Sequence, residues 1–314
     1  MPEGSHRVAV IDVGTNSARL LVADVAGGRV SPIERRSQVT RLGRGVDLSG
    51  RLSAEAIEDA CEAVGEYVAT VGELGAEAVD AIATSAVRDA ENGGAFVAEL
   101  RERFALSARV LDGEEEARLT YLGATSERTP TEPTLVVDIG GGSTELIVGT
   151  GTEISFHTSL QAGVVRHSER HIASDPPTVT ELEALANDVR GLIEAAVAGG
   201  VEAKAGIAVA GTPTSLAAVE MGLEPYDPAR VHGYVLSLPS IQRMLSQLAS
   251  APLSRRVEIP GLHPDRAPTV VAGIVILIET MRAFGLDQIE VSEHDILYGT
   301  AISASSNLIE HRDI

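Results

Sequence analysis

The stretch Val136–Val148, VVDIGGGSTELIV, contains three consecutive glycines between two apolar runs. Asp138 stands just before the glycines and Glu145 just after them. Short apolar runs on either side of a turn of small residues are typical of two strands joined by a tight hairpin. The stretch therefore predicts a strand, a glycine turn and a second strand, with one carboxylate on each strand.

The same pattern occurs earlier in the chain. Asp12–Val22, DVGTNSARLLV, aligns with Asp138–Val148 at an offset of 138 − 12 = 126 residues, and five of the eleven positions are identical. A hairpin near the start of each half, followed by alternating predicted helices and strands, indicates a duplicated α/β architecture. We therefore predict two copies of one α/β domain with a cleft between them.

The glycines give both turns a second property. Gly14 in the first turn and Gly140–Gly142 in the second lack a Cβ, so their backbone amides can approach a ligand closely. Successive exposed amides bind anions, and the hydroxyl groups of Ser17, Ser143 and Thr144 add donors. A glycine turn can also serve only to close a hairpin, which needs at most two glycines. Because two turns at matching positions each follow an aspartate, we favour phosphate binding.

Length and charge limit the classes of function. A chain of 314 residues is long enough for two domains of roughly 150 residues each. The 45 acidic and 25 basic residues give a formal net charge of −20, which argues against nucleic acid or a membrane surface bound through broad basic attraction. With this net charge, an anionic substrate would need a metal ion or positioned arginines. Lys204 is the only lysine, so arginines supply nearly all the positive charge, although a GC-rich genome is the favoured explanation of that skew.

Other features predict a cytoplasmic protein. Cys61 is the only cysteine, so no intrachain disulfide can form, and its place in a helical apolar pattern predicts a packed core residue. The N-terminus lacks the charged start and long apolar stretch of a signal peptide. The longest uncharged apolar run, Val270–Ile278, is too short to span a membrane and is predicted to be a buried helix.

The polar, proline-containing stretch Ser126–Pro133, SERTPTEP, is predicted to separate the two domains. We expect the first domain over residues 1–125 and the second over 126–295. Helices are expected at Ser53–Val71, Gly94–Phe104, Glu114–Ala124, Glu181–Ala198, Thr214–Met221 and Leu238–Ala249, and strands after the first hairpin at Ala78–Ala83, Ala108–Leu111, Gly206–Ala210 and Gln288–Val291.

Two groups of carboxylates are candidates for catalysis. Asp138 and Glu145 flank the glycine turn from opposite strands, and a few hard oxygen ligands, completed by water and phosphate, suit Mg²⁺. Carboxylates at strand ends also occur without a metal. Glu114–Glu116 open a predicted helix after Asp112, where the helix dipole favours acidic residues by ~0.3–1 kcal/mol each. By themselves, these three glutamates indicate only a helix start.

Six blocks of the sequence together resemble the exopolyphosphatase and guanosine pentaphosphate phosphohydrolase (Ppx/GppA) family. They are DVGTNSARL, ATSAVRDAEN, LDGEEEARL, VVDIGGGSTEL, GTPTSLAA and VSEHDILYG, in the family's order between about Val8 and Gly299. The resemblance implies two duplicated actin-like α/β domains of the ribonuclease H-like superfold that sugar kinases and heat-shock ATPases share. By the same analogy, a last helix, at about 296–314, is expected to pack on the first domain.

The resemblance implies a role for each matching residue. Glu116 falls where the family has its catalytic base, which takes a proton from the attacking water. Asp138 and Glu145 fall where the family binds Mg²⁺, or a similar divalent cation such as Mn²⁺. Arg88 falls where an arginine holds the substrate phosphates. The implied phosphate-binding residues are Gly14, Thr15, Asn16, Ser17, Arg88, Gly140, Gly141, Gly142, Ser143 and Thr144.

The implied activity is a Mg²⁺-dependent exopolyphosphatase that releases terminal orthophosphate from inorganic polyphosphate. Phosphoryl transfer needs mainly positioning and charge neutralisation, which amides, an arginine, a metal and one carboxylate supply. Hydrolysis of pppGpp by the same chemistry is the nearest alternative. A sugar or acetate kinase of the same fold and a phosphate-binding protein without activity are less favoured, because the EEEARL block and the retained carboxylates fit hydrolysis. Family members also commonly form homodimers.

Two features depart from the family pattern. The late block reads HDILYG where many members have Leu-Arg-Glu-Gly, so any contact that this arginine makes is missing here. Long members carry a C-terminal helical domain, and the sequence ends at Ile314 without one. We expect a shorter substrate channel as a result.

Two smaller motifs have several interpretations. His167 and His171 in RHSERH stand four residues apart, a spacing found in helical metal sites, but Ser168 replaces the glutamate of the metalloprotease pattern. We favour a structural or solvated role, and none of the other six of the eight histidines indicates a zinc site. The turn Gly211–Thr214 before a predicted helix fits a nucleotide, further phosphate or a simple helix cap equally well.

Overall fold

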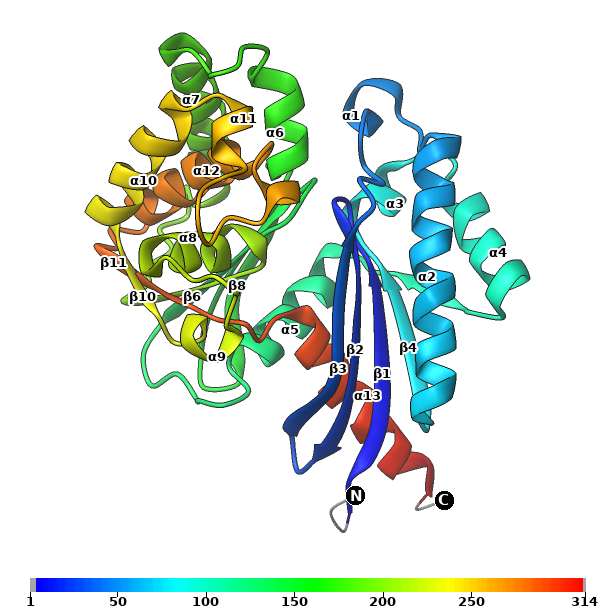
Figure 1. Cartoon of the computed structure of the whole chain (residues 1–314). Coiled ribbons are helices and arrows are strands. Elements are labelled where there is room, and N and C mark those ends of the chain that lie inside the picture. The colour runs from blue at the N-terminus through cyan, green and yellow to red at the C-terminus, as the bar shows by residue number, and fades with distance from the viewer. Residues whose placement is uncertain (1–3, 313–314) are drawn as a thin grey trace. The chain divides into compact units, whose positions relative to one another are not determined.

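The computed structural model describes residues 4–312 of the chain. The chain divides into two compact units. Unit 1 extends from the N-terminal part to Arg128 and resumes at His294, and unit 2 comprises Thr129–Glu293. Within the described residues, each unit is built on one mixed sheet with helices on its faces (Figure 1).

The sheet of unit 1 has the strand order β3-β2-β1-β4-β5. β1 (His6–Val13) pairs antiparallel with β2 (Ser17–Ala26) and parallel with β4 (Ala78–Ala83). The other elements of unit 1 are β3 (Arg29–Val39), α1 (Val46–Ser49), α2 (Ala54–Leu74), α3 (Ser85–Asp89), α4 (Gly93–Phe104), β5 (Ala108–Val110), α5 (Gly113–Ala124) and α13 (Ile296–Arg312).

Both faces of the central strand β1 pack against apolar clusters, and its successive side chains point to opposite faces of the sheet. Along β1, Ala9 and Ile11 belong to the apolar cluster that α2 completes. Val8 and Val10 belong to the cluster that α13 completes. Figure 1 shows α2 and α13 on opposite sides of the strands of unit 1.

The helices α5 and α13 approach each other at two glycines. A Cβ on Gly123 would lie 1.9 Å from the carbonyl oxygen of Asp295, and a Cβ on Gly299 would lie 1.8 Å from that of Leu119. No side chain fits at such distances, so glycine is required at both positions. Because α5 carries Glu116 in its first turn, this crossing fixes the place of Glu116 in unit 1.

The sheet of unit 2 has the order β10-β11-β9-β6-β7-β8. β6 (Thr134–Ile139) pairs antiparallel with β7 (Thr144–Thr150) and parallel with β9 (Ala205–Val209). The other elements of unit 2 are β8 (Glu153–Leu160), α6 (Val164–His171), α7 (Val179–Ala196), α8 (Gly211–Met221), α9 (Pro228–Val231), β10 (Val235–Ser237), α10 (Leu238–Ser250), α11 (Leu253–Arg256), η1 (Pro264–Arg266), α12 (Val270–Ala283) and β11 (Gln288–Val291).

The two sheets repeat one topology. β1, β2, β3, β4 and β5 have the same order and relative directions as β6, β7, β8, β9 and β11. The duplicated α/β architecture predicted from the repeat at an offset of 126 residues is therefore confirmed.

The predicted buried helix over Val270–Ile278 is also confirmed, because α12 is buried from Val270 to Met281. It lies inside the apolar core of unit 2. Throughout residues 4–312, no helix combines the length and the apolar character that crossing a bilayer requires.

Candidate active site

The first glycine turn, Gly14–Ser17, joins β1 to β2 and contacts α3. The Gly14 amide donates to the Ser17 carbonyl at 3.1 Å, so this amide closes the turn. Thr15 Oγ1 accepts a hydrogen bond from the Ala86 amide at 3.2 Å and lies 3.3 Å from Ser85 Oγ. These contacts hold the turn beside α3, the helix that carries Arg88.

The second turn, Gly140–Ser143, closes in the same way, with the Gly140 amide donating to the Ser143 carbonyl at 3.0 Å. The carbonyls of this turn face the start of α6. Gly163 permits this approach, because a Cβ there would lie 2.3 Å from the Gly141 carbonyl oxygen. The hydrogen bonds are Val164 amide to Gly140 carbonyl (2.9 Å), Val165 amide to Gly141 carbonyl (2.9 Å) and Arg166 Nε to Gly142 carbonyl (2.8 Å).

Both turns keep amides that bond to no group in the described part of the chain. These are the amides of Thr15 and Asn16 in the first turn and of Gly141–Ser143 in the second. The Asn16 Nδ2 group is buried and also lacks a partner there. Since buried donors are nearly always paired, the turns have the donor groups that an anion would satisfy. Thr144 differs, because its hydroxyl group already donates to the Ala162 carbonyl.

Glu116 is buried in the first turn of α5, next to Arg88. It exposes 6% of its surface, and its Oε2 accepts a hydrogen bond from Arg88 Nη1 at 2.7 Å. Burial raises the pKa of Glu116, the Arg88 guanidinium lowers it, and the nearby Asp12 raises it again, with a net increase. A carboxylate with a raised pKa is suited to general base catalysis near neutral pH.

Asp12, at the end of β1, is a buried carboxylate that the sequence analysis did not name as a site residue. Its Oδ2 lies 2.6 Å from Arg19 Nη2, and Arg19 also pairs with Asp295. Its Oδ1 has no hydrogen-bond partner in residues 4–312. Burial raises the pKa of Asp12, and the charge of Arg19 only partly offsets this. The signal that could have found it is the alignment of Asp12 with Asp138.

Asp138 and Glu145 stand directly opposite each other on β6 and β7. Directly opposed side chains of an antiparallel pair share one face, with Cβ atoms about 4.5–5.5 Å apart. Both are buried, and Glu145 Oε1 accepts a hydrogen bond from Ser159 Oγ at 2.8 Å. Two buried carboxylates on one face are a donor set of hard oxygens, which fits Mg²⁺.

The turn Gly211–Thr214 forms the start of α8. Thr214 Oγ1 donates to the carbonyl of Ala210, which has a φ of 73°. A Cβ on Gly211 would lie 2.6 Å from the guanidinium carbon of Arg266. The start of α8 thus combines a helix N-terminus with an arginine, two features that favour an anion.

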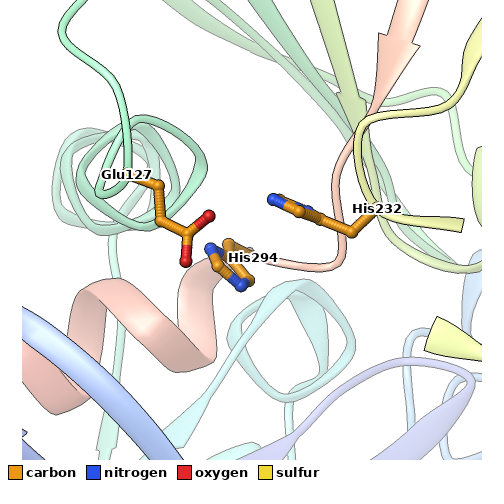
Figure 2. Close-up of side chains that lie close together, drawn as sticks. All are labelled: Glu127, His232 and His294. Carbon is orange, nitrogen blue, oxygen red and sulfur yellow. The ribbon is translucent and has the colours of Figure 1, made fainter. Parts of the chain in front are cut away.

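Glu127 and His294 lie near the points where the chain leaves and re-enters unit 1. The Glu127 carboxylate points toward the His294 ring (Figure 2), and their ligand atoms lie within 4.8 Å. His294 also stacks on Tyr298, with 3.9 Å between ring centroids. In unit 2, His232 Nδ1 accepts a hydrogen bond from the Glu293 amide at 3.2 Å. The sequence analysis assigned no role to these residues.

Comparison with known proteins places these features in one family. The Ppx/GppA phosphatase family matches residues 21–303. Exopolyphosphatase 2 of Mycobacterium tuberculosis (strain CDC 1551 / Oshkosh) is 36% identical over 313 residues, which cover 95% of this chain and 98% of that protein. The guanosine-5'-triphosphate,3'-diphosphate pyrophosphatase of Photobacterium profundum is 27% identical, over 96% of this chain and 60% of that protein.

Solved structures agree with this placement. The crystal structure of the Aquifex aeolicus member of the Ppx/GppA family is similar with a TM-score of 0.83 and 32% identity, over 98% of this chain and 99% of that one. The predicted fold of two duplicated actin-like α/β domains is confirmed by this likeness and by the repeated sheet topology. The chain therefore belongs to the Ppx/GppA phosphatase family.

Proposed function

We propose that this protein is an exopolyphosphatase that hydrolyses the terminal phosphoanhydride bond of inorganic polyphosphate and releases orthophosphate. The observation that carries the proposal is the buried Glu116 carboxylate. Its pKa is raised, and its Oε2 accepts a hydrogen bond from Arg88 Nη1 at 2.7 Å. The 36% identity to an exopolyphosphatase over nearly the whole of both chains supports the substrate.

In the proposed reaction, Glu116 acts as the general base. A water oxygen attacks the terminal phosphorus in line with the bond to the bridging oxygen, and one proton of that water passes to the Glu116 carboxylate. The P–O bond to the bridging oxygen breaks, so that orthophosphate leaves and the shortened chain keeps that oxygen. No covalent enzyme intermediate is needed, because positioning and charge neutralisation supply most of the catalysis.

We propose that Arg88 and the unpaired donors of the two glycine turns bind the substrate phosphates. The amides of Thr15 and Asn16 and the Asn16 side chain would donate to phosphate oxygens, since they have no partners in the described structure. Arg88 would orient Glu116 and contact the substrate phosphates, because a guanidinium offers five donors in a planar fork. The amides of Gly141–Ser143 in unit 2 would bind phosphate in the same manner.

A divalent cation, proposed as Mg²⁺, would be held by Asp138 and Glu145. Their opposed positions on one face and their all-oxygen donor set fit this ion. When bound, the ion neutralises charge that develops on the phosphoryl group. The matching pair in unit 1 is Asp12 and Arg19, where the arginine already neutralises the carboxylate. We therefore place the metal ligands in unit 2.

The nearest alternative is hydrolysis of pppGpp. It is supported by the similar protein of Photobacterium profundum, which is named a guanosine-5'-triphosphate,3'-diphosphate pyrophosphatase. Release of orthophosphate by the purified chain should be compared on polyphosphate and on pppGpp, each with Mg²⁺. We expect faster turnover per enzyme on polyphosphate, with Glu116→Gln as the inactive control. Faster release from pppGpp would reverse the assignment, and ATP-dependent phosphorylation of an added sugar would replace it with a kinase.

We also propose that the enzyme acts in the cytoplasm as a homodimer. The sequence has a single cysteine, Cys61, and therefore no intrachain disulfide of the kind that oxidising compartments maintain. Light scattering of the purified chain measures the mass in solution, and the mass of a single chain would contradict the dimer.

A further inference from the structure

Unit 2 contains a second cluster of titratable side chains that the proposed hydrolysis does not use. His167 and His171 lie one helical turn apart on α6, and Asp188 lies on the neighbouring helix α7 (Figure 1). Residues four apart on a helix face the same side. Packing of α7 against α6 thus brings a carboxylate to the two imidazole rings.

The three side chains converge on a small volume. His171 Nε2 lies 2.8 Å from Asp188 Oδ2, and His167 Nε2 lies 3.5 Å from the same oxygen. The nearest ligand atoms of all three lie within 4.8 Å of one another. In a tetrahedral zinc site with ligand bonds of about 2.0–2.1 Å, two ligand atoms are about 3.3 Å apart. The two distances from Asp188 Oδ2 to the imidazole nitrogens, 2.8 and 3.5 Å, lie on either side of this spacing.

His167 provides an independent sign of a missing ligand. Its side chain is fully buried, and neither Nδ1 nor Nε2 has a hydrogen-bond partner in the described chain. A buried polar group without a partner costs free energy, so one in a native protein needs an explanation. A metal ion on Nε2 would provide the missing partner.

We propose that His167, His171 and Asp188 bind a transition-metal dication of the zinc class through the two Nε2 atoms and the carboxylate. Two imidazoles and one carboxylate suit Zn²⁺, and three protein ligands leave one position for water. The site differs from that of Asp138 and Glu145, whose oxygen donors suit Mg²⁺.

Arg170 competes with the metal for the carboxylate. Its Nη1 lies 3.4 Å from Asp188 Oδ2, and its charge repels a cation. Removing this charge by Arg170→Gln should therefore tighten zinc binding. Arg170→Gln thus tests the proposal by an increase in zinc affinity, whereas removal of a ligand tests it by a decrease.

The site would connect α6, which supports the glycine turn, to α7. α6 begins with amides that donate to the carbonyls of Gly140 and Gly141, and a metal shared with Asp188 would fix α6 against α7. We expect the bound metal to raise the stability of unit 2.

The test uses the full chain after removal of metals with a chelator, titrated with Zn²⁺ in excess Mg²⁺ and followed by calorimetry. All variants carry Asp138→Asn and Glu145→Gln, so that zinc cannot bind at the other carboxylate pair. We expect one strong site in this background. Loss of a neighbouring group commonly costs about 10–100-fold in affinity, so His171→Gln or Asp188→Asn, which remove a ligand, should cost at least about 100-fold.

The matched control is His157→Gln, which removes an exposed histidine of β8 in the same unit. It should bind zinc as the background protein does. Cobalt in place of zinc provides a second readout, because four-coordinate Co²⁺ absorbs visible light much more strongly than the hydrated ion. This absorption should be lost in His171→Gln. Circular dichroism confirms that each variant is folded. Absence of a strong site in the background protein, or equal affinity in His171→Gln and His157→Gln, would overturn the proposal.

Discussion

Arg88 Nη1 donates hydrogen bonds both to Glu116 Oε2, at 2.7 Å, and to the Leu111 carbonyl, at 2.9 Å. The guanidinium therefore joins α3 to the segment that leads into α5, and it holds the Glu116 carboxylate in one orientation. Glu116 is thus ionised more easily than its burial alone would allow, yet its pKa remains above the ordinary value.

Replacing the proposed base should stop turnover without preventing substrate binding. Glu116→Gln keeps the shape of the side chain but cannot accept a proton, so we expect kcat to fall by at least ~100-fold. Binding of polyphosphate should persist, as measured by calorimetry. Glu114→Gln, which changes an exposed glutamate in the same helical turn, should leave turnover unchanged. Near-normal kcat in Glu116→Gln would remove this residue from the mechanism.

Removing Arg88 should change the pH profile as well as substrate affinity. The base is active only when ionised, and the Arg88 charge lowers the pKa of Glu116. In Arg88→Ala that pKa rises, so the acid limb of kcat/KM should move to higher pH by about 1 unit or more. KM should also increase, because a phosphate contact is lost.

Arg88→Lys should show a smaller shift of the acid limb than Arg88→Ala, because lysine keeps a positive charge beside Glu116. An unaltered saturation curve in Arg88→Ala would show that Arg88 does not contact substrate. An unaltered acid limb would show that Glu116 is not the titrating base.

Changing the opposed carboxylates of unit 2 should weaken activation by Mg²⁺. Asp138→Asn or Glu145→Gln removes one charged oxygen ligand, so more Mg²⁺ should be needed for half-maximal activity, by at least about 10-fold. Glu153→Gln, an exposed carboxylate on β8, is the matched control. The ligand assignment fails if the magnesium titrations of the two substituted proteins match the control.

Adding a methyl group at the crossing of α5 and α13 should destabilise the protein. The Cβ of Gly299→Ala would lie 1.8 Å from the Leu119 carbonyl oxygen, so the helices must separate. We expect a loss of about 1–3 kcal/mol in the free energy of unfolding, measured with urea. Gly72→Ala in α2, where a Cβ meets nothing within 4 Å, should instead stabilise by about 0.5–1 kcal/mol. Equal changes in the free energy of unfolding for Gly299→Ala and Gly72→Ala would contradict the close contact between α5 and α13.

Some strands escaped sequence analysis because they lie at sheet edges. β3 is an edge strand of unit 1, is largely exposed and carries Glu34, Arg35 and Arg36, so it lacks the apolar alternation by which strands are found. Its Pro32 lies next to an irregularity in the pairing with β2, a position that an edge strand tolerates. β8 occupies the corresponding edge in unit 2.

The two hairpins, their repeat and the opposed positions of Asp138 and Glu145 could be predicted from the sequence, because these features depend on residues that are close together in the chain. Gly14 and Gly140 each close their turn by the same short hydrogen bond, as the shared motif predicts.

Which carboxylates are buried, and which groups they contact, became visible in the folded chain alone. Glu116 reads as an ordinary helix-start residue until folding brings Arg88, 28 residues away, to its carboxylate. His167 and His171 likewise gain Asp188 only when α7 packs on α6. Burial and charge pairing, which set a pKa or create a metal site, depend on distances in space between groups distant in sequence.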